Sequence, residues 1–428
     1  MNPIASCLAS TIDAENAICL WENLEHSQQK QIQQAIASAN PPTCIVYPRT
    51  QRQLAAVIAE AHRHRWRVLP CGKRSKINWG GLATGIDIVV STERINQLIA
   101  HAVGDLTVTV EAGMQFSQLQ GILAQARQFI ALDPSKPELA TIGGIVATGD
   151  TGSLRQRYGS VRDQLLGITF VRSDGQIAKA GGRVVKNVAG YDLMKLFAGA
   201  YGTLGIISQV TFRVYPLQEA SSTVALTGTP EAICQAAATL RNSALTPTQA
   251  DLLSTQLVSE LGWNQGLGLI ARFQSISESV KEQSNRLLAV AERLGLDGKI
   301  YVNEHEDHLW QRLRELMDDL GKDSTITCKI GVSPTAAVEV LTQTEMGLIH
   351  IGSGLGWLQF EDEKQILKMR DRCQQHRGFV SILTASNQVK QAIDVWGYTG
   401  NSLHVMRQIK AQFDSKNILN PGRFVGGI

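Results

Sequence analysis

Hydrophobic positions in the first half of the chain follow both the helical and the strand period. Residues 54–61 carry apolar side chains at helical spacing, which predicts a helix buried on one face. Thr50 and Gln53 form a capping-box pattern at its start, in which each side chain satisfies a free amide of the other. Apolar runs at residues 44–47 and 67–69 flank this helix. The order strand, helix, strand therefore opens this part of the chain.

Strict alternation of apolar and polar side chains marks two longer strands. Residues 106–111 and 210–214 both alternate with a period of two, which predicts strands buried on one face only. Residues 173–176 read Ser-Asp-Gly-Gln between two apolar runs, the pattern of a hairpin turn. The first half of the chain is thus expected to be α+β with mixed strands.

The pattern changes along the chain and suggests four parts. Residues 1–39 are rich in Gln and Ala, with Leu24, Ile32 and Ile36 at helical spacing, and predict a helical lead-in. Helix-like and strand-like pieces alternate from residue 217 to about 390. We expect these parts to be a lead-in (1–39), a first domain (40–216), a second domain (217–390) and a C-terminal segment (391–428). Asn-Pro-Gly at 420–422 forms a turn, which predicts that the segment returns to the first domain.

Composition and charge exclude several classes of protein. The 428 residues hold 41 Lys and Arg against 38 Asp and Glu, too small an excess for a nucleic-acid-binding surface. The seven cysteines are scattered and no CxxC pair occurs, so neither an iron–sulfur cluster nor a zinc site is expected. Acidic residues interrupt the N-terminus and no apolar run is long enough to span a membrane. These features predict a reduced, cytoplasmic chain.

Two glycine-containing segments are candidates for holding phosphate. The loop Gly72–Lys76 follows a predicted strand and carries three cations. Thr141–Gly144 leads into a predicted helix whose free amides can face a pyrophosphate. Adjacent glycines also let a ligand approach the backbone closely. Each signal alone is weak, because a glycine pair before a helix is common turn chemistry.

Further motifs make the pattern specific. The chain carries, in this order, TIGG (141–144), RYGSVRD (157–163), KNVAGYDL (186–193), GTLGII (202–207) and NPG (420–422). This series resembles the FAD-binding family of the vanillyl-alcohol oxidase and p-cresol methylhydroxylase type, in its glycolate oxidase and D-lactate dehydrogenase branch. The resemblance is good over residues 40–216 and loose elsewhere.

The resemblance implies a fold, a cofactor and a set of contacts. The fold would be α+β, with an FAD domain of two α+β subdomains, an α/β cap and a C-terminal segment that packs on the FAD domain. FAD would be held without a covalent bond, because the loop Gly72–Lys76 contains no histidine. The residues implied to contact FAD are Gly72, Lys73, Arg74, Ser75, Lys76, Pro134, Thr141, Ile142, Gly143, Gly144, Ala147, Thr148, Gly152, Ser153 and Ile207.

The first loop departs from the family. Its members usually have consecutive glycines here, whereas this chain follows Gly72 with Lys73 and Arg74. A side chain then stands where the backbone often needs a positive φ. Either the two cations compensate by pairing with phosphate, or the loop has lost its hold on the cofactor.

A second departure concerns catalysis. Catalytic relatives carry HAGDGNLH in the cap, where imidazoles take a substrate proton or bind a metal. Here His350 remains, but Ser353 replaces the Asp and Trp357 replaces the second His. Tyr201 stands where catalytic relatives usually have Glu and resembles the accessory flavin subunit. His350 is therefore the candidate catalytic base, with a structural histidine as the alternative.

Three functions remain open from the sequence. The first is an FAD-binding subunit that exchanges electrons with a catalytic flavin subunit and an iron–sulfur subunit, which could hold it at a membrane. The second is a self-sufficient D-2-hydroxyacid dehydrogenase acting on glycolate or D-lactate. The third is a structural subunit that no longer binds flavin. A nicotinamide-dependent enzyme is disfavoured, because no GxGxxG follows a predicted strand.

No metal site is expected. His62 and His64 lie at the end of the first predicted helix beside two arginines, and are interpreted as a solvated cluster facing the helix dipole. Residues 304–308 read Glu-His-Glu-Asp-His, which on a helix gives an ordinary exposed pair. Trp310, Leu313 and Leu316 follow as the apolar stripe of that helix.

Overall fold

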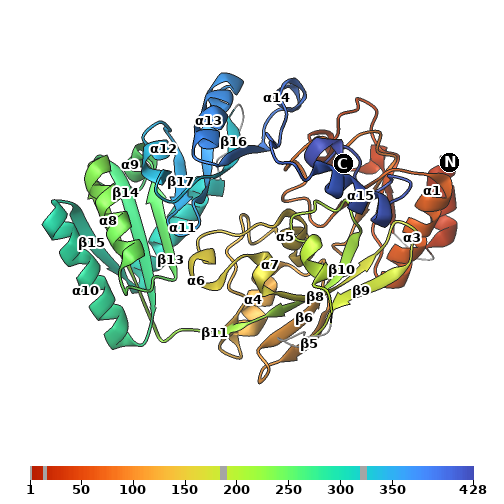
Figure 1. The fold of residues 1–428 in the computed structure, drawn as a ribbon. Helices are drawn as coiled ribbons and strands as arrows, with labels where there is room; N and C mark the ends of the chain where they lie inside the picture. The colour runs from red at the N-terminus through yellow and green to blue at the C-terminus, as the bar shows by residue number, and fades with distance from the viewer. Residues whose placement is uncertain (1, 13–16, 184–189, 319–324) are drawn as a thin grey trace. The chain divides into compact units, whose positions relative to one another are not determined.

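The computed structural model describes residues 2–12, 17–183, 190–318 and 325–428. The chain divides into two compact units (Figure 1). Unit 1 comprises residues 1–151, 160–216 and 398–428, and unit 2 comprises residues 152–159 and 217–397. Each unit has its own sheets and its own hydrophobic clusters. The mixed α+β architecture expected from the sequence is confirmed.

The first sheet of unit 1 is small and largely parallel. Its strands, in spatial order, are β1 (Ile18–Leu20), β2 (Cys44–Val46), β4 (Ile88–Ser91) and β3 (Val68–Cys71). β2, β4 and β3 are parallel, as expected for strands joined through a helix, while β1 is antiparallel to β2. That helix is α3 (Gln51–His64), whose buried residues are Leu54, Val57, Ile58 and Ala61, as predicted.

The N-terminal lead-in is only partly helical. It holds α1 (Pro3–Thr11), a 3-10 turn η1 (Trp21–Asn23) and α2 (His26–Gln33), but also β1. Helices are thus present in this segment, and the strand β1 was not expected from the sequence. β1 extends the first sheet because the residues from Ile18 to Leu20 pair with β2. Such pairing is a tertiary contact that local periodicity does not report.

The second sheet of unit 1 is antiparallel. Its strands, in spatial order, are β5 (Leu98–Ala102), β6 (Thr107–Glu111), β10 (Ile206–Arg213), β8 (Leu165–Val171) and β9 (Ile177–Gly181). The predicted hairpin turn at 173–176 joins β8 to β9. β6 is buried on both faces and not on one. On the face that carries Thr109, its hydroxyl shares a hydrogen bond of 3.0 Å with the hydroxyl of Thr211 in the interior. A buried hydroxyl pair thus mimics a solvent-facing pattern in the sequence.

Short helices and one small ribbon complete this part of unit 1. They are α4 (Phe116–Ala124), β7 (Gln128–Phe129), α5 (Ile142–Thr148), α7 (Val161–Gln164), η2 (Leu193–Leu196) and β11 (Tyr215–Pro216). β7 and β11 pair with each other. α4 and α5 pack on the second sheet through a shared apolar cluster. This packing holds α5 beside the ends of β6 and β10.

The C-terminal segment belongs to unit 1 from Tyr398 onward. It contains α15 (Leu403–Phe413) and η3 (Val425–Gly427). The buried Lys410 Nζ donates to Thr203 O, Asp414 Oδ2 and Leu419 O at 2.9, 2.6 and 2.8 Å. These bonds tie the segment to the chain near residue 203, so the polypeptide returns to unit 1 after passing through unit 2.

Unit 2 is one antiparallel sheet with helices on both faces. Its strands, in spatial order, are β15 (Asp297–Val302), β12 (Ala220–Gly228), β14 (Leu267–Ser275), β13 (Gln249–Leu253), β17 (Gly347–His350), β18 (Leu355–Phe360), β16 (Ile326–Gly331) and β19 (Phe379–Thr384). One face packs against α8 (Pro230–Asn242), α10 (Ser277–Leu294), α12 (Ala337–Leu341) and α13 (Glu363–Gln375). The other packs against α9 (Thr255–Glu260) and α11 (Asn303–Asp318). Two short helices, α6 (Arg155–Tyr158) and α14 (Asn387–Ala392), complete the unit.

Candidate functional site

A cleft in unit 1 brings together most of the residues that the sequence suggested for a cofactor. It is bordered by the loop after β3, by α5 and by the start of β10. The predicted residues that line it are Gly72, Lys73, Arg74, Ser75, Lys76, Thr141, Gly143, Gly144, Ala147, Thr148 and Ile207. Segments about 70 and 135 residues apart in the sequence thus meet at one place, which suits a large, extended ligand.

The loop Gly72–Lys76 offers the cleft a row of backbone donors. None of its N–H groups donates a hydrogen bond to another described residue. Arg74 has φ +65°, in the left-handed region, as expected where the family has glycine. Consecutive amides around such a residue form a concave anion-binding nest. The loop therefore suits a phosphate although Gly72 is its one glycine.

The cations of this loop have different partners. Arg74 Nη1 lies 3.3 Å from Glu93 Oε2, and Lys76 Nζ lies 3.0 Å from Asp150 Oδ2. Both pairs are largely buried, because the side chains turn away from solvent toward these carboxylates. Lys73 forms no ion pair with a described residue. Of the two cations expected to compensate for the lost glycines, Lys73 is thus the one not already paired with a carboxylate.

Gly72 is required by a close approach to α5. A Cβ added to Gly72 would lie 2.9 Å from Thr141 Cγ2 and 3.0 Å from Thr141 Cβ, and closer still to Oγ1. Thr141 cannot give way easily, because it is buried and its Oγ1 caps α5 by accepting from Gly144 N at 3.3 Å. The contact between loop and helix therefore leaves no room for a side chain at position 72.

The amides at the start of α5 are not free, contrary to expectation. Ile142 N donates to Met114 O at 2.9 Å, and Gly143 N donates to Ala112 O at 2.8 Å. Gly144 N is engaged by Thr141. The chain after β6 and Thr141 satisfy these donors, so the free backbone donors described above belong to the loop Gly72–Lys76 and not to the start of this helix.

The cleft includes residues that the sequence did not single out as ligands. These are Pro70, Cys71, Ile77, Thr92, Tyr201, Gly202, Gly205, Ile206, Asn420 and Arg423. Pro70 and Cys71 follow the predicted strand at 67–69, and Gly202, Gly205 and Ile206 belong to the motif GTLGII. Asn420 and Arg423 were read only as part of a C-terminal turn, and only the return of the chain to unit 1 places them here.

Arg423 and Asn420 line this cleft, and each has a buried polar atom without a hydrogen-bond partner among the described residues. Arg423 is 3% exposed and donates from Nη1 to Ala35 O at 3.0 Å and from Nη2 to Ile77 O. Burial lowers the pKa of Arg423 to about 10, so it remains charged at neutral pH. Its Nε has no hydrogen-bond partner among the described residues, nor has Asn420 Oδ1. A buried cation with a spare donor suits an anionic cofactor.

Four residues implied by the resemblance are placed outside the lining of the cleft. The side chain of Ile142 lies in the apolar core of unit 1. Pro134 precedes Ser135, whose N and Oγ donate to Asp150 Oδ2 at 3.0 and 3.2 Å. Gly152 and Ser153 belong to unit 2. The motif residues 186–189 lie outside the described residues.

Unit 2 contains a buried polar network around His350. Asp251 on β13 and His350 on β17 are direct cross-strand partners. His350 Nδ1 lies 2.6 Å from Asp251 Oδ1, and Ser153 Oγ donates to Asp251 Oδ2. All three residues are buried. A carboxylate only accepts, so Nδ1 carries the proton and the tautomer of His350 is set by Asp251.

The degenerate cap motif surrounds this network. Leu348 pairs with Trp357 on β18, and Leu348 belongs to the apolar cluster on the α11 side of the sheet. Because side chains alternate along a strand, His350 and Trp357 face this same side. Ser353 lies in the turn between them, where its Oγ accepts from Leu355 N at 3.3 Å. An indole thus stands on the face where the family motif has its second imidazole, and indole is not a metal ligand.

The segment 304–308 and the apolar residues that follow it lie on α11. Glu304 and His308 are both exposed on α11, as predicted for that pair, whereas Glu306 between them is buried and accepts from Thr223 Oγ1 at 2.6 Å. Leu313 is buried in the same helix, with Trp310 and Leu316 packed beside it, as predicted.

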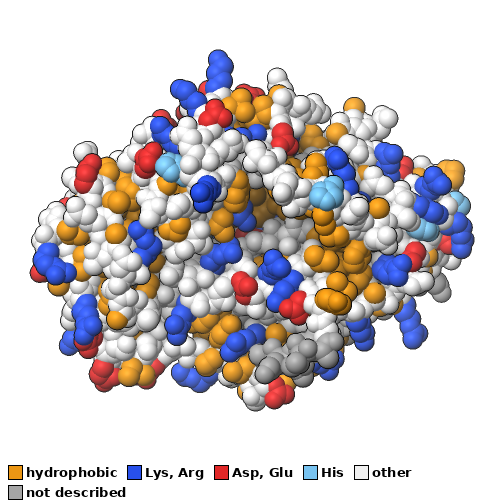
Figure 2. Space-filling view, in the orientation of Figure 1, with side chains coloured by type: hydrophobic (Ala, Val, Ile, Leu, Met, Phe, Trp, Pro, Cys, Tyr) orange, Lys and Arg blue, Asp and Glu red, His pale blue; other side chains and the backbone are white. Residues whose placement is uncertain are grey.

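Lys and Arg side chains are spread among acidic and uncharged ones on the visible face (Figure 2), consistent with the near-neutral net charge.

Comparison with known proteins finds similarity to flavin-dependent proteins. Residues 42–181 match the family of FAD binding domains, and residues 396–424 match the C-terminal domain of FAD-linked oxidases. The solved structure of p-cresol methylhydroxylase with substrate bound covers 99% of this chain with a TM-score of 0.74, and the chain covers 96% of it at 14% identity. The chain therefore has the fold of p-cresol methylhydroxylase and, with an FAD binding domain at residues 42–181, is a flavoprotein. The lining residues from Pro70 to Thr148 lie within the match to the FAD binding domain, and Asn420 and Arg423 lie within the C-terminal match.

Relatives of this flavoprotein include several dehydrogenases and oxidase subunits. It is 24% identical to glycolate oxidase subunit GlcD of Bacillus subtilis over 89% of its own length and 88% of the relative's. It is 36% identical to glycolate oxidase subunit GlcE of Escherichia coli over 35% of its length and 43% of the relative's. It is 27% identical to a mitochondrial D-lactate dehydrogenase (cytochrome) of Arabidopsis thaliana over 65% of its length, and spans about half (51%) of that protein. The flavoprotein is thus an FAD-dependent oxidoreductase.

No helix among the described residues of this flavoprotein is both long enough and apolar enough to cross a membrane.

Proposed function

We propose that this chain is the FAD-binding subunit of a complex that oxidises a small 2-hydroxy acid, such as glycolate. It would exchange electrons with a catalytic flavin subunit and an iron–sulfur subunit. The relatives support this role, because two of them are glycolate oxidase subunits. The chain's cysteines are all free, with no clustered set for an iron–sulfur centre of its own. Residues 40–216 with the C-terminal segment would form the FAD domain, and residues 217–390 the cap.

The residues of the cleft suggest how FAD would be bound. The N–H groups of the loop Gly72–Lys76 and the ammonium of Lys73 would hold the pyrophosphate, and Arg423 would neutralise charge from the buried side. Ala147 and Ile207 would offer apolar surface to the flavin or adenine ring. Bound FAD would supply the capacity to accept two electrons and to release them one at a time.

One observation favours the accessory role over substrate oxidation. The only cap-motif histidine left, His350, is buried, and its Nδ1 is held by Asp251, while Trp357 and Ser353 replace its motif partners. A pair of imidazoles that could bind a metal or relay a proton is therefore missing from this motif. His350 then acts in structure, by joining β17 to β13 and, through Asp251, to Ser153.

A second candidate function is a self-sufficient D-2-hydroxyacid dehydrogenase. The same Asp251 contact supports it, since a carboxylate on Nδ1 leaves Nε2 able to accept a proton, as in a general base held by an orienting group. His350→Gln should then abolish flavin reduction by substrate, whereas His404→Gln, at an exposed position on α15, should not. The third candidate, a subunit without flavin, is disfavoured by the free donors of the cleft.

The visible absorption spectrum of the purified chain with added FAD tests these alternatives. We expect bound flavin that glycolate and D-lactate leave oxidised, and that becomes reduced by glycolate when the catalytic flavin subunit is present. Bleaching by either acid in the chain alone would overturn the accessory role. A chain that stays colourless after FAD is added would overturn flavin binding altogether.

A further inference from the structure

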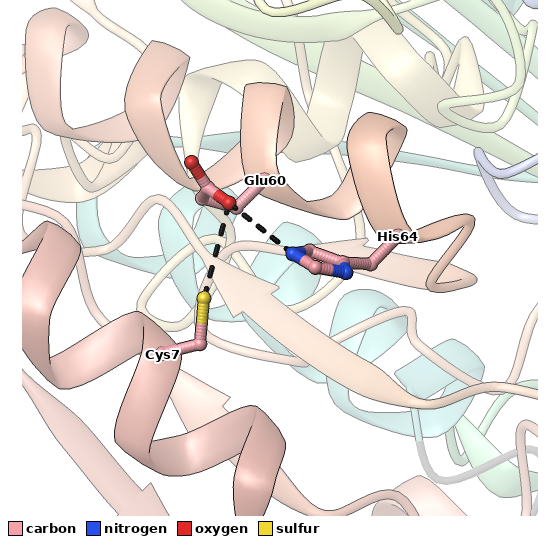
Figure 3. Close-up of side chains that lie close together, drawn as sticks. All are labelled: Cys7, Glu60 and His64. Atoms are coloured by element: carbon pink, nitrogen blue, oxygen red, sulfur yellow. Dashed lines mark hydrogen bonds and ion pairs between the residues drawn. The ribbon is translucent and has the colours of Figure 1, made fainter.

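A group of metal-ligating side chains lies in unit 1 among residues that line no part of the cleft. Cys7 on α1 meets Glu60 and His64 on α3 (Figure 3). Glu60 and His64 are one helical turn apart, so they share a face of α3. The two helices pack together, and Leu8, next to Cys7, is fully buried against the core beneath them. The fold therefore brings together side chains that are 53 residues apart in the sequence.

The ligand atoms converge at a spacing that suits a transition metal. Cys7 Sγ lies 3.8 Å from Glu60 Oε2, and His64 Nε2 lies 3.6 Å from the same oxygen. All three atoms lie within 4.8 Å of one another. Bonds of about 2.0–2.3 Å in a tetrahedral sphere separate ligand atoms by roughly 3.3–3.8 Å. Two of the three separations already match, and the third, between Cys7 and His64, is at most 4.8 Å.

We propose that Cys7, Glu60 and His64 form a binding site for a zinc-like divalent cation. A thiolate, an imidazole and a carboxylate are the donors that zinc prefers, and three protein ligands leave a fourth position for water. Binding replaces the thiol proton of Cys7, which is released to solvent. The ion joins the N-terminal helix α1 to α3 and stabilises the start of the chain. The proposal is independent of the flavin function.

The surroundings of the three residues support this site and give it a specific test. The ring of His64 stacks on Trp66 with centroids 4.8 Å apart, which restricts the ring. Arg63 Nη1 lies 2.9 Å from Glu60 Oε1 and 3.1 Å from Oε2, so it competes with a cation for this carboxylate. The Arg63 side chain is 70% exposed and can move into solvent. Removing its charge should therefore strengthen metal binding, an effect that a purely structural thiol–carboxylate contact does not predict.

Zinc titration of the full chain by calorimetry tests the proposal, with Co²⁺ as a spectroscopic probe. We expect one Zn²⁺ per chain and, with Co²⁺, thiolate-to-metal charge-transfer absorption. Cys7→Ser should remove that absorption, and Cys7→Ser and His64→Asn should each weaken zinc binding by about tenfold or more. Arg63→Gln should tighten it. Matched controls are Cys19→Ser, at a half-buried thiol outside the group, and His404→Asn, at an exposed histidine.

Three results would overturn the site. These are no zinc binding by the wild-type chain, zinc binding unchanged in Cys7→Ser, and binding that the two control variants weaken as much. Melting temperatures measured with and without zinc guard against misfolding. The ion should raise the melting temperature of the wild-type chain and of Cys19→Ser but not of Cys7→Ser.

Discussion

Replacing Gly72 by Ala should weaken FAD binding because the new methyl group has no space. It would lie 2.9 Å from Thr141 Cγ2 and 3.0 Å from its Cβ, with Oγ1 nearer still. Thr141 is 2% exposed and caps α5, so the strain should displace the loop Gly72–Lys76. Overpacking of this kind costs about 1–3 kcal/mol. If FAD binding must restore the loop, the dissociation constant should rise roughly 5- to 150-fold.

The quenching of flavin fluorescence on titration gives this dissociation constant directly. Gly104→Ala is the matched control, since nothing lies within 4 Å of a Cβ at that position. In the double variant Gly72→Ala/Thr141→Ala the Oγ1 and Cγ2 atoms are gone, so the two changes should be less than additive. An FAD affinity of Gly72→Ala within twofold of the wild type would refute the reasoning, and so would full additivity.

Two further predictions concern buried groups of unit 1. Lys410→Met should lower the free energy of unfolding by about 3–5 kcal/mol, because it leaves the buried Asp414 without its ion pair. Urea unfolding measures this free energy, and a loss below about 1 kcal/mol would contradict the role of Lys410. Burial raises the pKa of the Cys71 thiol to about 11, so the reactive thiolate is scarce at neutral pH and alkylation should accelerate about tenfold per pH unit between pH 7 and 10. Mass spectrometry of Cys71 alkylation tests this, with added FAD expected to slow the reaction because Cys71 lines the cleft; a rate that ignores both pH and FAD would be inconsistent with that environment.

The local sequence determined much of unit 1. The apolar spacing of α3 and the Asp-Gly turn between β8 and β9 depend on neighbouring residues, so they were predicted correctly. Even the capping of α3 was nearly right: Thr50 Oγ1 accepts from Gln53 N at 3.2 Å, although Gln53 Oε1 accepts from Arg49 N and not from Thr50. Periodicity and capping are short-range effects that a single sequence reports well.

Tertiary structure decided which donors and charges the cleft presents. Arg74 and Lys76 looked equivalent to Lys73 in the sequence, but Glu93 and Asp150 approach only in the folded chain and pair with them. Likewise the amides of α5 looked free, and the carbonyl groups after β6 occupy them.

The same distinction applies to His350 and to the proposed metal site. Asp251 lies 99 residues from His350, and Cys7 lies 53 residues from Glu60, so no local motif could reveal either contact. The sequence by itself determined the elements and the family of motifs, because these depend on spacing along the chain. The protonation and pairing of buried groups were decided by the tertiary structure, because Coulomb and hydrogen-bond energies depend on distances between atoms in space.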